Sequence, residues 1–343
     1  MSSVDVIVPC YNYGHLVEAC VRSVLSQQQV DVRVLLMDDA STDDTESVGR
    51  RLAADPRVEY RRHAVNIGHI HSYNEALACL TADYCLILSA DDLLTPGALV
   101  RAARLMDAHP EVGLTYGRDI TFRHTPPVGV ARANKYCAHR IMNYAEFLER
   151  SCLLGHTPIQ SPTAVARTAL HREIGEYLPE LPHSGDTEIW LRMAAHAKVC
   201  ELSADQAFRR LHAHNMSLDY PPLRRLEEQK KAFDIHFNAY RSRRPEIASF
   251  EPLLNRTIAE AAFWSGSRAF DGGDTRECDA FLSFASAVWP DIGSSAPWRR
   301  LRWKRRMGRG AYRWLAPVAA RVRQVASGRP KREAENPPGV GTK

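Results

Sequence analysis

The sequence predicts an α/β protein with a mostly parallel central sheet, followed by a small helical C-terminal region. In the first 120 residues, short apolar runs alternate with segments whose apolar residues recur at helical spacing. Two of the apolar runs lead into paired aspartates, Asp38-Asp39 and Asp91-Asp92. Strands that alternate with helices form parallel sheets through right-handed crossovers, and ligands bind beyond the carboxyl ends of such strands.

The expected strands are short, nearly continuous apolar runs, as in strands buried on both faces. They cover residues 4–9, 32–37, 58–61, 84–88 and 112–116. Helices are expected between them, over residues 16–25, 44–54 and 72–80. A further helix should begin with Thr95 as its N-cap and Pro96 in its first position.

The second half of the chain is less regular at first and then helical. Residues 118–160 show no clear period. A helix is expected from Asp186, as its cap, to about residue 197, followed by strands near 199–202 and 208–212. Residues 222–285 have a helical pattern that Gly272-Gly273 interrupts. We therefore divide the chain into a catalytic domain at 1–220, a helical region at 221–291 and a basic, partly disordered tail at 292–343.

Composition sets limits on the class of protein. Apolar residues make up 45% and charged residues 25% of the 343, which is ordinary for a globular protein. The eight cysteines form no Cys-x-x-Cys pair, so they are interpreted as reduced and mostly buried, in a reducing compartment. We find no signal peptide and no run of about 20 apolar residues that could span a bilayer. These features favour a cytoplasmic protein.

Paired carboxylates at strand ends indicate a cation site. A single aspartate after a strand is equally well explained as a turn former or a helix cap. Two such pairs at the same edge of a sheet would repel each other unless a cation or a donor-rich ligand were bound. Hard oxygen ligands suit Mg²⁺ or Mn²⁺.

Six short motifs in order resemble the family 2 glycosyltransferases, over about residues 3–217. These segments are Val6–Asn12, Ser23–Gln27, Met37–Asp43, Asn66–Gly68, Tyr73–Leu77 and Ser89–Leu99. The resemblance implies the GT-A fold and transfer of a sugar from a nucleotide diphosphate carrier to an acceptor hydroxyl, with inversion. It also implies a divalent metal, Mn²⁺ or Mg²⁺. From the basic tail at 292–343 we expect a glycan or lipid-linked acceptor in the assembly of cell-surface polysaccharide.

The resemblance assigns a set of residues to the nucleotide. Asp39 should accept a hydrogen bond from the base, and Asp38 should fix the loop. The residues expected to bind the nucleotide are Pro9, Tyr11, Asn12, Asp38, Asp39, Asn66, Gly68, Asn74 and Asp91. His71 is a further, weaker candidate near the base.

The metal is assigned to Asp91, Asp92 and His212. Asp91 resembles the last aspartate of the Asp-x-Asp motif, which holds the metal that bridges both phosphates. Ser89 stands at the first position of that motif, so a direct metal contact by residue 89 is in doubt. His212 belongs to a segment, residues 209–217, that resembles the element closing over the diphosphate.

Asp186 is the expected catalytic base. The segment Gly185–Arg192 resembles the acidic motif that carries this base, with Gly185 where glutamate is common. An inverting transfer needs a carboxylate to accept the acceptor's proton. Glu188 is the substitute candidate, and the alternative for Asp186 is a role as helix cap alone.

Two other enzyme classes are excluded by the turn after the first strand. Both a dinucleotide-binding dehydrogenase and a sugar-nucleotide pyrophosphorylase need a glycine-rich loop there, and residues 11–15 contain a single glycine.

A non-catalytic scaffold that binds membrane or nucleic acid through the basic tail remains an alternative. Residues 292–343 carry fourteen lysines and arginines and two glutamates. Ten lysines and arginines, with no acid, are interleaved with tryptophan, tyrosine and aliphatic residues in 298–323. We expect this segment to bind an anionic membrane at its inner face, in two pieces divided at Pro317, and not nucleic acid.

Overall fold

The computed structural model describes residues 1–129, 138–213, 215–216 and 220–308. The strands are β1 (Ser3–Cys10), β2 (Asp31–Asp38), β3 (Val58–Arg62), β4 (Tyr84–Ile87), β5 (Leu93–Leu94), β6 (Val112–Phe122), β7 (His139–Met142), β8 (Val165–Arg167) and β9 (Lys198–Arg210). The helices of the first half are α1 (Gly14–Leu25), α2 (Thr45–Leu52), α3 (His69–Ala78), α4 (Ala98–Ala108), α5 (Tyr144–Leu154), η1 (Ser161–Thr163) and α6 (Thr168–Ile174). Those of the second half are α7 (Gly185–His196), α8 (Pro222–Tyr240), α9 (Ile247–Gly272), α10 (Thr275–Val288), η2 (Pro290–Ser294) and α11 (Ala296–Met307).

Two compact units make up the chain, Met1–Ile258 and Ala259–Lys343. The first holds the whole sheet, and the second begins inside α9 and continues through α11. The three-part division that we drew from the sequence stays a prediction.

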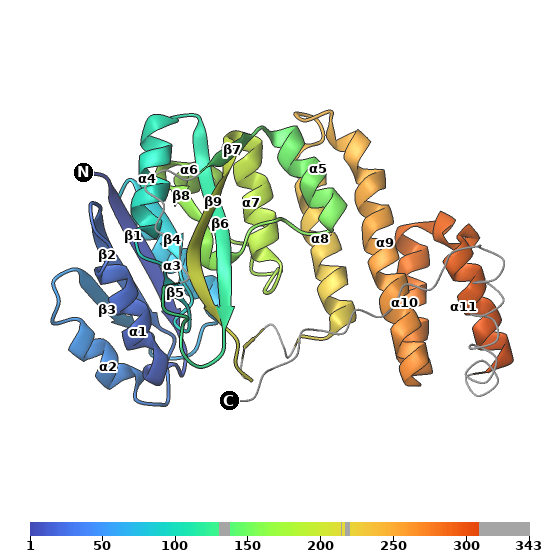
Figure 1. Ribbon diagram of the computed structural model, residues 1–343, viewed down its shortest axis with the longest axis horizontal. Helices are drawn as coiled ribbons and strands as arrows, with labels where there is room; N and C mark the ends of the chain where they lie inside the picture. The colour runs from blue at the N-terminus through green and yellow to red at the C-terminus, as the bar shows by residue number, and fades with distance from the viewer. Residues whose placement is uncertain (130–137, 214, 217–219, 309–343) are drawn as a thin grey trace, which may run out of the picture. The chain divides into compact units, whose positions relative to one another are not determined.

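The sheet has the order β3-β2-β1-β4-β8-β6-β9-β5, and β7 pairs with β9 (Figure 1). The pairs β2–β3, β1–β2, β1–β4 and β6–β9 are parallel. The antiparallel pairs involving β5, β7 and β8 are short, two to four residue positions each. The expectation of a mostly parallel sheet is confirmed, with the correction that short antiparallel strands make it mixed.

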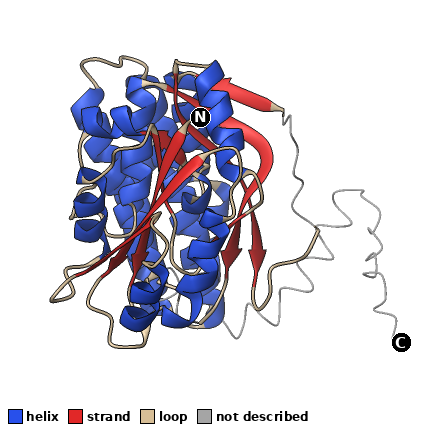
Figure 2. Cartoon of the chain, turned by 90° about the vertical axis from the view of Figure 1, so that its left-hand side faces the viewer, coloured by secondary structure: helices blue, strands red, loops and turns tan. Residues whose placement is uncertain are grey.

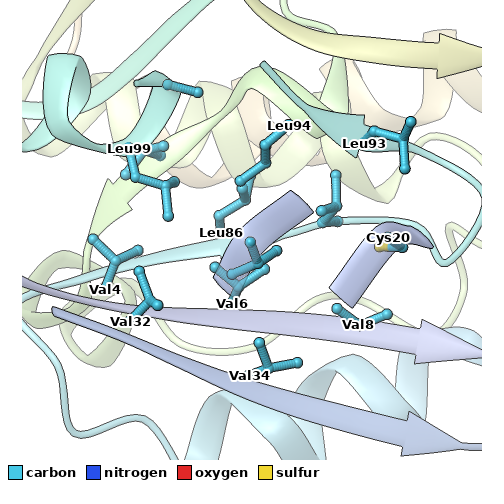
Figure 3. Packing of buried hydrophobic residues seen from close by; sticks show 14 of the residues in the cluster. Val4, Val6, Val8, Cys20, Val32, Val34, Leu86, Leu93, Leu94 and Leu99 are labelled. Carbon is cyan, nitrogen blue, oxygen red and sulfur yellow. The ribbon is translucent and has the colours of Figure 1, made fainter. Parts of the chain in front are cut away.

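Helices pack on both faces of this sheet, as the strands and helices of Figure 2 show. On one face, Val4, Val6 and Val8 of β1 pack with Val34 of β2 and with residues of α1, α2 and α4 (Figure 3). On the other face, Ile7 is also fully buried, on the side where α3 contacts β1. Burial on both faces explains why these strands appear as continuous apolar runs in the sequence.

The first four expected strands lie within two residues of the observed ones, but the start of the fourth helix was predicted wrongly. Helix α4 begins at Ala98, and its N-cap is Gly97 with φ 75°. The Thr95 hydroxyl donates instead to the Asp205 carbonyl at 2.6 Å, and the Thr95 amide donates to the Gln206 carbonyl at 3.1 Å. Thr95 therefore makes its hydrogen bonds to β9, next to the β5–β9 pair, and does not cap helix α4.

Strand β9 also differs from the expectation. It runs without a break from Lys198 to Arg210, where the sequence suggested two strands. Elements between residues 118 and 175 were missed, among them β7, α5, β8 and α6. Helix α5 carries a capping box formed by Asn143 and Glu146, a signal that the sequence offered.

Seven of the eight cysteines are described, all as free thiols. All except Cys79 are buried, which agrees with their interpretation as reduced apolar side chains. Cys137 lies outside the described residues. Among the residues that the structure describes, no helix combines the length and the apolar character needed to cross a membrane.

Candidate active site

A cavity of about 860 Å³ lies at the carboxyl ends of β1, β2 and β4. Most of the site residues predicted from the sequence line it: Pro9, Tyr11, Asn12, Asp39, Asn66, Gly68, Asp91, Asp92, Asp186 and His212. Asp38 and Asn74 are not among the lining residues, and neither is His71, which is exposed. The parallel register of the strands thus brings together residues that are far apart in the sequence.

Asn12 joins the loops that follow β1 and β2. Its backbone is left-handed, with φ 61°, and its amide donates to the Ser41 hydroxyl at 2.9 Å. Its side-chain Oδ1 accepts from the Thr42 amide at 2.8 Å. Asn12 therefore helps to hold together the two loops that form this wall of the cavity.

Asp38 supports the same loops from inside the fold. It is fully buried, and its Oδ1 accepts from the Ser41 amide at 2.8 Å. Its Oδ2 accepts from the Tyr60 hydroxyl at 2.6 Å and lies 3.3 Å from the Arg62 guanidinium. The structure thus places the Asp38 carboxylate away from the cavity, which disagrees with its assignment as a nucleotide contact and agrees with a role in fixing the loop.

Asp39 orders the segment that leads into α3. Its Oδ1 accepts from the Ile67 amide at 2.8 Å and lies 2.9 Å from His63 Nδ1. Its Oδ2 accepts from the Gly68 amide at 2.9 Å. A carboxylate has about four acceptor positions, so Oδ2 can accept one more hydrogen bond, and Asp39 lines the cavity.

The histidine that contacts Asp39 was not singled out from the sequence. His63 Nε2 also lies 3.2 Å from the Glu75 carboxylate, so the ring bridges two acids. Asn74, predicted as a nucleotide contact, instead pairs with the backbone of Tyr177, donating at 2.9 Å and accepting at 2.8 Å. Asn74 therefore fixes the segment before α7.

Asp91 and His212 are neighbours in space although 121 residues separate them. His212 Nε2 lies 2.9 Å from Asp91 Oδ2, which also accepts from the Asn215 side chain at 3.1 Å. Asp92 accepts from the Arg210 amide at 2.9 Å. Burial, together with the neighbouring charge of Asp91, raises the pKa of Asp92 to about 8. Two adjacent buried carboxylates are thus costly to ionise together in this structure.

The residues at this position fit a divalent cation bound together with a ligand. No group of three His, Cys, Asp or Glu side chains that could hold a metal occurs among the described residues. Mg²⁺ and similar ions are commonly held by one or two carboxylates plus substrate phosphates, so a complete protein cage is not required. Asp91 and Asp92 supply hard oxygen donors, and a bound cation would relieve their mutual repulsion.

Asp186 lies in the first turn of α7 and lines the cavity. The helix N-cap is Ser184, so Asp186 is not the cap that the sequence suggested. Its Oδ2 accepts a hydrogen bond from the Ser161 hydroxyl, and Tyr177 lies close enough to act on the charge of the carboxylate. Burial raises the pKa of Asp186, and the two hydroxyls partly oppose that rise because they favour the ionised form. This combination is typical of a general base.

Glu188, the substitute candidate, faces away from the cavity. Its carboxylate makes two hydrogen bonds with the Arg192 guanidinium, at 3.0 and 2.6 Å. Arg192 also donates to the carbonyls of Ile174 and Glu176, both at 2.7 Å. The buried pair therefore braces the segment before α7, and Glu188 has no access to a substrate in the cavity.

Glu228 of α8 supports α7 from behind and was missed in the sequence. It is buried, and its Oε1 accepts from the amides of His183 and Ser184 at 2.6 and 2.8 Å. Its Oε2 accepts from the Tyr220 hydroxyl, while the Tyr220 ring lies 3.6 Å from that of His183. An acidic residue on the buried stripe of an amphipathic helix was the available signal.

Comparison with known proteins agrees with this geometry. The sequence model of Glycosyl transferase family 2 matches residues 5–175. An uncharacterized protein of Mycobacterium tuberculosis, MT1568, is 26% identical over 217 residues, which is 60% of this chain and 66% of that protein. Chondroitin synthase of Pasteurella multocida is 26% identical over 229 residues, 66% of this chain and 22% of the synthase. The chain thus spans less than two thirds of the length of these relatives.

Solved structures show the same fold. S. aureus TarS, residues 1–349, in complex with UDP-GlcNAc, has a TM-score of 0.64 at 19% identity, covering 96% of this chain and 93% of that one. The mannosyltransferase PcManGT from Pyrobaculum calidifontis, in complex with GDP-Man and Mn²⁺, has a TM-score of 0.50 at 20% identity, covering 95% and 88%. The expectation of a GT-A fold is confirmed. The matched segment, the relatives and the fold together show that the chain belongs to the family 2 glycosyltransferases.

Proposed function

We propose that the chain transfers a sugar from a nucleotide diphosphate carrier to an acceptor hydroxyl, with inversion at the anomeric carbon. The observation that carries the proposal is one cavity lined both by Asp39 and Asp91 and by Asp186. The first two carboxylates suit a nucleotide and a cation, and the third suits a proton acceptor. Two structural relatives hold UDP-GlcNAc and GDP-Man, which supports a nucleotide sugar as the donor class.

In the proposed reaction, Asp186 accepts the proton of the acceptor hydroxyl while the hydroxyl oxygen bonds to the anomeric carbon. The bond from that carbon to the diphosphate oxygen breaks, and its electron pair leaves with the nucleoside diphosphate. Ser161 holds the carboxylate in place, and both Ser161 and Tyr177 favour its ionised form before the proton arrives. Attack and departure occur on opposite faces of the sugar, so the configuration inverts.

The donor end is held by the loops that follow β1 and β2. The free acceptor position of Asp39 Oδ2 suits an N–H of the base, and the loops joined by Asn12 border it. Asp91, with Asp92 and His212 beside it, would hold a divalent cation against the diphosphate. When bound, such a cation stabilises the charge that develops on the leaving diphosphate. PcManGT, which was solved with Mn²⁺, supports this metal dependence.

The acceptor class follows from the relatives rather than from the cavity. Chondroitin synthase makes a polysaccharide, so we infer a glycan or lipid-linked glycan acceptor in cell-surface polysaccharide assembly. The family match and the lined cavity favour catalysis over the alternative of a non-catalytic scaffold. Release of nucleoside diphosphate from a panel of UDP- and GDP-sugars, with and without Mn²⁺, tests the proposal. Absence of release, together with no thermal stabilisation by any nucleoside diphosphate, would contradict it.

A further inference from the structure

Helix α11 presents one face to its own unit and another to the outside. On the inner face, Leu301 is buried with 3% of its surface exposed. The Trp298 ring stacks on Phe263, with ring centroids 5.6 Å apart and planes 29° apart. The Ser295 hydroxyl caps the helix by accepting from the Trp298 amide at 3.3 Å. The helix is therefore anchored by ordinary packing through this face.

Two of its basic residues complete this anchoring. Lys304 lies 3.4 Å from the Asp271 carboxylate of α9, and Arg305 pairs with Asp279 of α10. These pairs fix the rotation of α11 about its own axis. Only two of the six basic residues of the helix take part in these pairs. The other four are Arg299, Arg300, Arg302 and Arg306.

The outer face is a stripe of arginine and tryptophan. Arg299, Arg302, Trp303 and Arg306 stand at positions i, i+3, i+4 and i+7, which share one side of a helix. All four are exposed, Trp303 to 48%. Arg302 and Arg306 make no hydrogen bond or ion pair with other described residues, and Arg299 bonds to the Ser294 carbonyl without losing its charge. We call these four residues the α11 stripe.

We propose that the α11 stripe docks the protein on the surface of an anionic lipid membrane. Guanidinium groups bind lipid phosphates through paired hydrogen bonds, and an exposed tryptophan among them suits the layer between headgroups and acyl chains. The sequence beyond the helix continues this composition, with four more arginines and no acid from residue 309 to 323. The α11 stripe lies within residues 296–307. The remainder of the predicted membrane segment, from residue 309 to 323 and with Pro317 included, lies outside the described residues.

A lipid surface is favoured over nucleic acid by charge distribution. Outside residues 292–343 the chain carries 31 basic and 38 acidic residues, so its body would be repelled by a polyanion that wraps around it. A flat anionic surface needs only one face of one helix. The proposal does not rest on glycosyl transfer, since binding to vesicles is measured without any substrate.

The test is co-sedimentation of the full chain with vesicles of phosphatidylglycerol and phosphatidylcholine, compared with phosphatidylcholine alone. Binding should require the anionic lipid and weaken as salt rises to about 0.15 M, where charges are screened beyond about 8 Å. Replacing Arg299, Arg302 and Arg306 together by glutamine should lower the partition coefficient by about 100-fold, since each basic residue near the surface contributes about fivefold. Trp303→Ala should cause a smaller loss that persists at higher salt.

The matched charge control replaces Arg50, Arg57 and Arg241 by glutamine. These arginines are also exposed and lie outside the cavity. Their replacement removes the same formal charge, but from the first unit. This control should sediment like the unmodified chain. Trp264→Ala is the aromatic control, since Trp264 of α9 is 51% exposed but lies outside the α11 stripe.

Three outcomes would overturn the assignment. The first is equal binding to neutral vesicles, and the second is equal loss in the stripe variant and its charge control. The third is a full chain that does not bind anionic vesicles at low salt, whether or not it binds duplex nucleic acid. Circular dichroism and thermal unfolding of the same preparations show whether each variant is folded. Neither measurement depends on the proposed transfer reaction, so failure here leaves that reaction untouched.

Discussion

Replacing Asp186 by asparagine tests the assignment of the catalytic base. The amide keeps the size of the side chain and can still accept from the Ser161 hydroxyl, so the cavity should keep its shape. It cannot accept a proton from the acceptor. Loss of a positioned general base costs about 10² to 10⁴ in rate, equivalent to about 2.7 to 5.5 kcal/mol of activation free energy. We therefore expect turnover to fall by this factor while nucleoside diphosphate affinity stays close to that of the parent.

Stability separates loss of the base from loss of the fold. Because the pKa of Asp186 is raised above its unfolded value of 3.8, the ionised carboxylate destabilises the folded protein increasingly as pH rises from the unfolded pKa through the folded one. Asparagine lacks this dependence, so the variant should gain stability relative to the parent as pH rises through that window. Asp234→Asn is the matched control, at a half-buried carboxylate of α8 that pairs with Lys230 outside the cavity. It should leave the rate unchanged and cost no more than the few tenths of a kcal/mol of one helical ion pair. Near-parental turnover of the Asp186 variant would refute the assignment of the base.

Three further predictions follow from the contacts of the cavity. Asp91→Ala should abolish the metal-dependent part of nucleoside diphosphate binding, whereas Ser89→Ala should leave it in place. Calorimetry with and without Mn²⁺ measures both effects, and equal affinities for the two variants and the parent would contradict the metal assignment. Ser161→Ala removes a donor that favours the ionised form of Asp186, so the pKa of that carboxyl should rise and the acid limb of the pH–rate profile should move to higher pH, with little change well above it. Glu228→Ala leaves two backbone amides without an acceptor, that of Ser184 buried and that of His183 partly buried, which should cost about 1 to 3 kcal/mol of unfolding free energy in denaturant titrations and lower kcat more than nucleotide affinity. Glu228→Gln should restore part of the lost unfolding free energy and part of the lost kcat. An unchanged kcat in the alanine variant would exclude a positioning role.

The first half of the fold could be predicted because its strands are buried on both faces. A strand such as β1 has apolar residues on each side, so a short apolar run in the sequence marks it directly. Strands β5, β7 and β8 have two to four residues each, too few to show a period. They exist through pairing with distant strands, as when β8 joins β4 to β6. Such pairing depends on contacts far apart in the chain, which a local pattern does not contain.

The residues of the candidate site also fall into two groups, those that the sequence could place in the cavity and those that it could not. Loops after parallel strands meet at one edge by geometry, so Asp39 and Asp91 could be placed in a common cavity from the sequence. Adjacent residues in those loops point in different directions, and the sequence does not show which one faces the cavity. Asp38 is buried against Tyr60, while Asp39 beside it lines the cavity. The support of α7 by Glu228 depends on packing between α7 and α8, which local patterns do not encode.

The departure from the family at Gly185 has a physical explanation in this packing. A Cβ atom at residue 185 would lie 3.3 Å from Cδ1 of the Tyr177 ring and 3.6 Å from Cδ1 of Ile70, so a glutamate side chain would crowd that ring. Tyr177 is held there by Asn74, which makes two hydrogen bonds with its backbone, and Tyr177 favours the ionised form of Asp186. The absence of a side chain at Gly185 therefore allows a tyrosine to approach the proposed base. In this chain the residue before the proposed base carries no carboxylate, and the nearby Tyr177 hydroxyl is neutral. A neutral donor favours the ionised form of Asp186, whereas a neighbouring negative charge would disfavour it. The loss of glutamate at residue 185 is thus consistent with retained base function at Asp186.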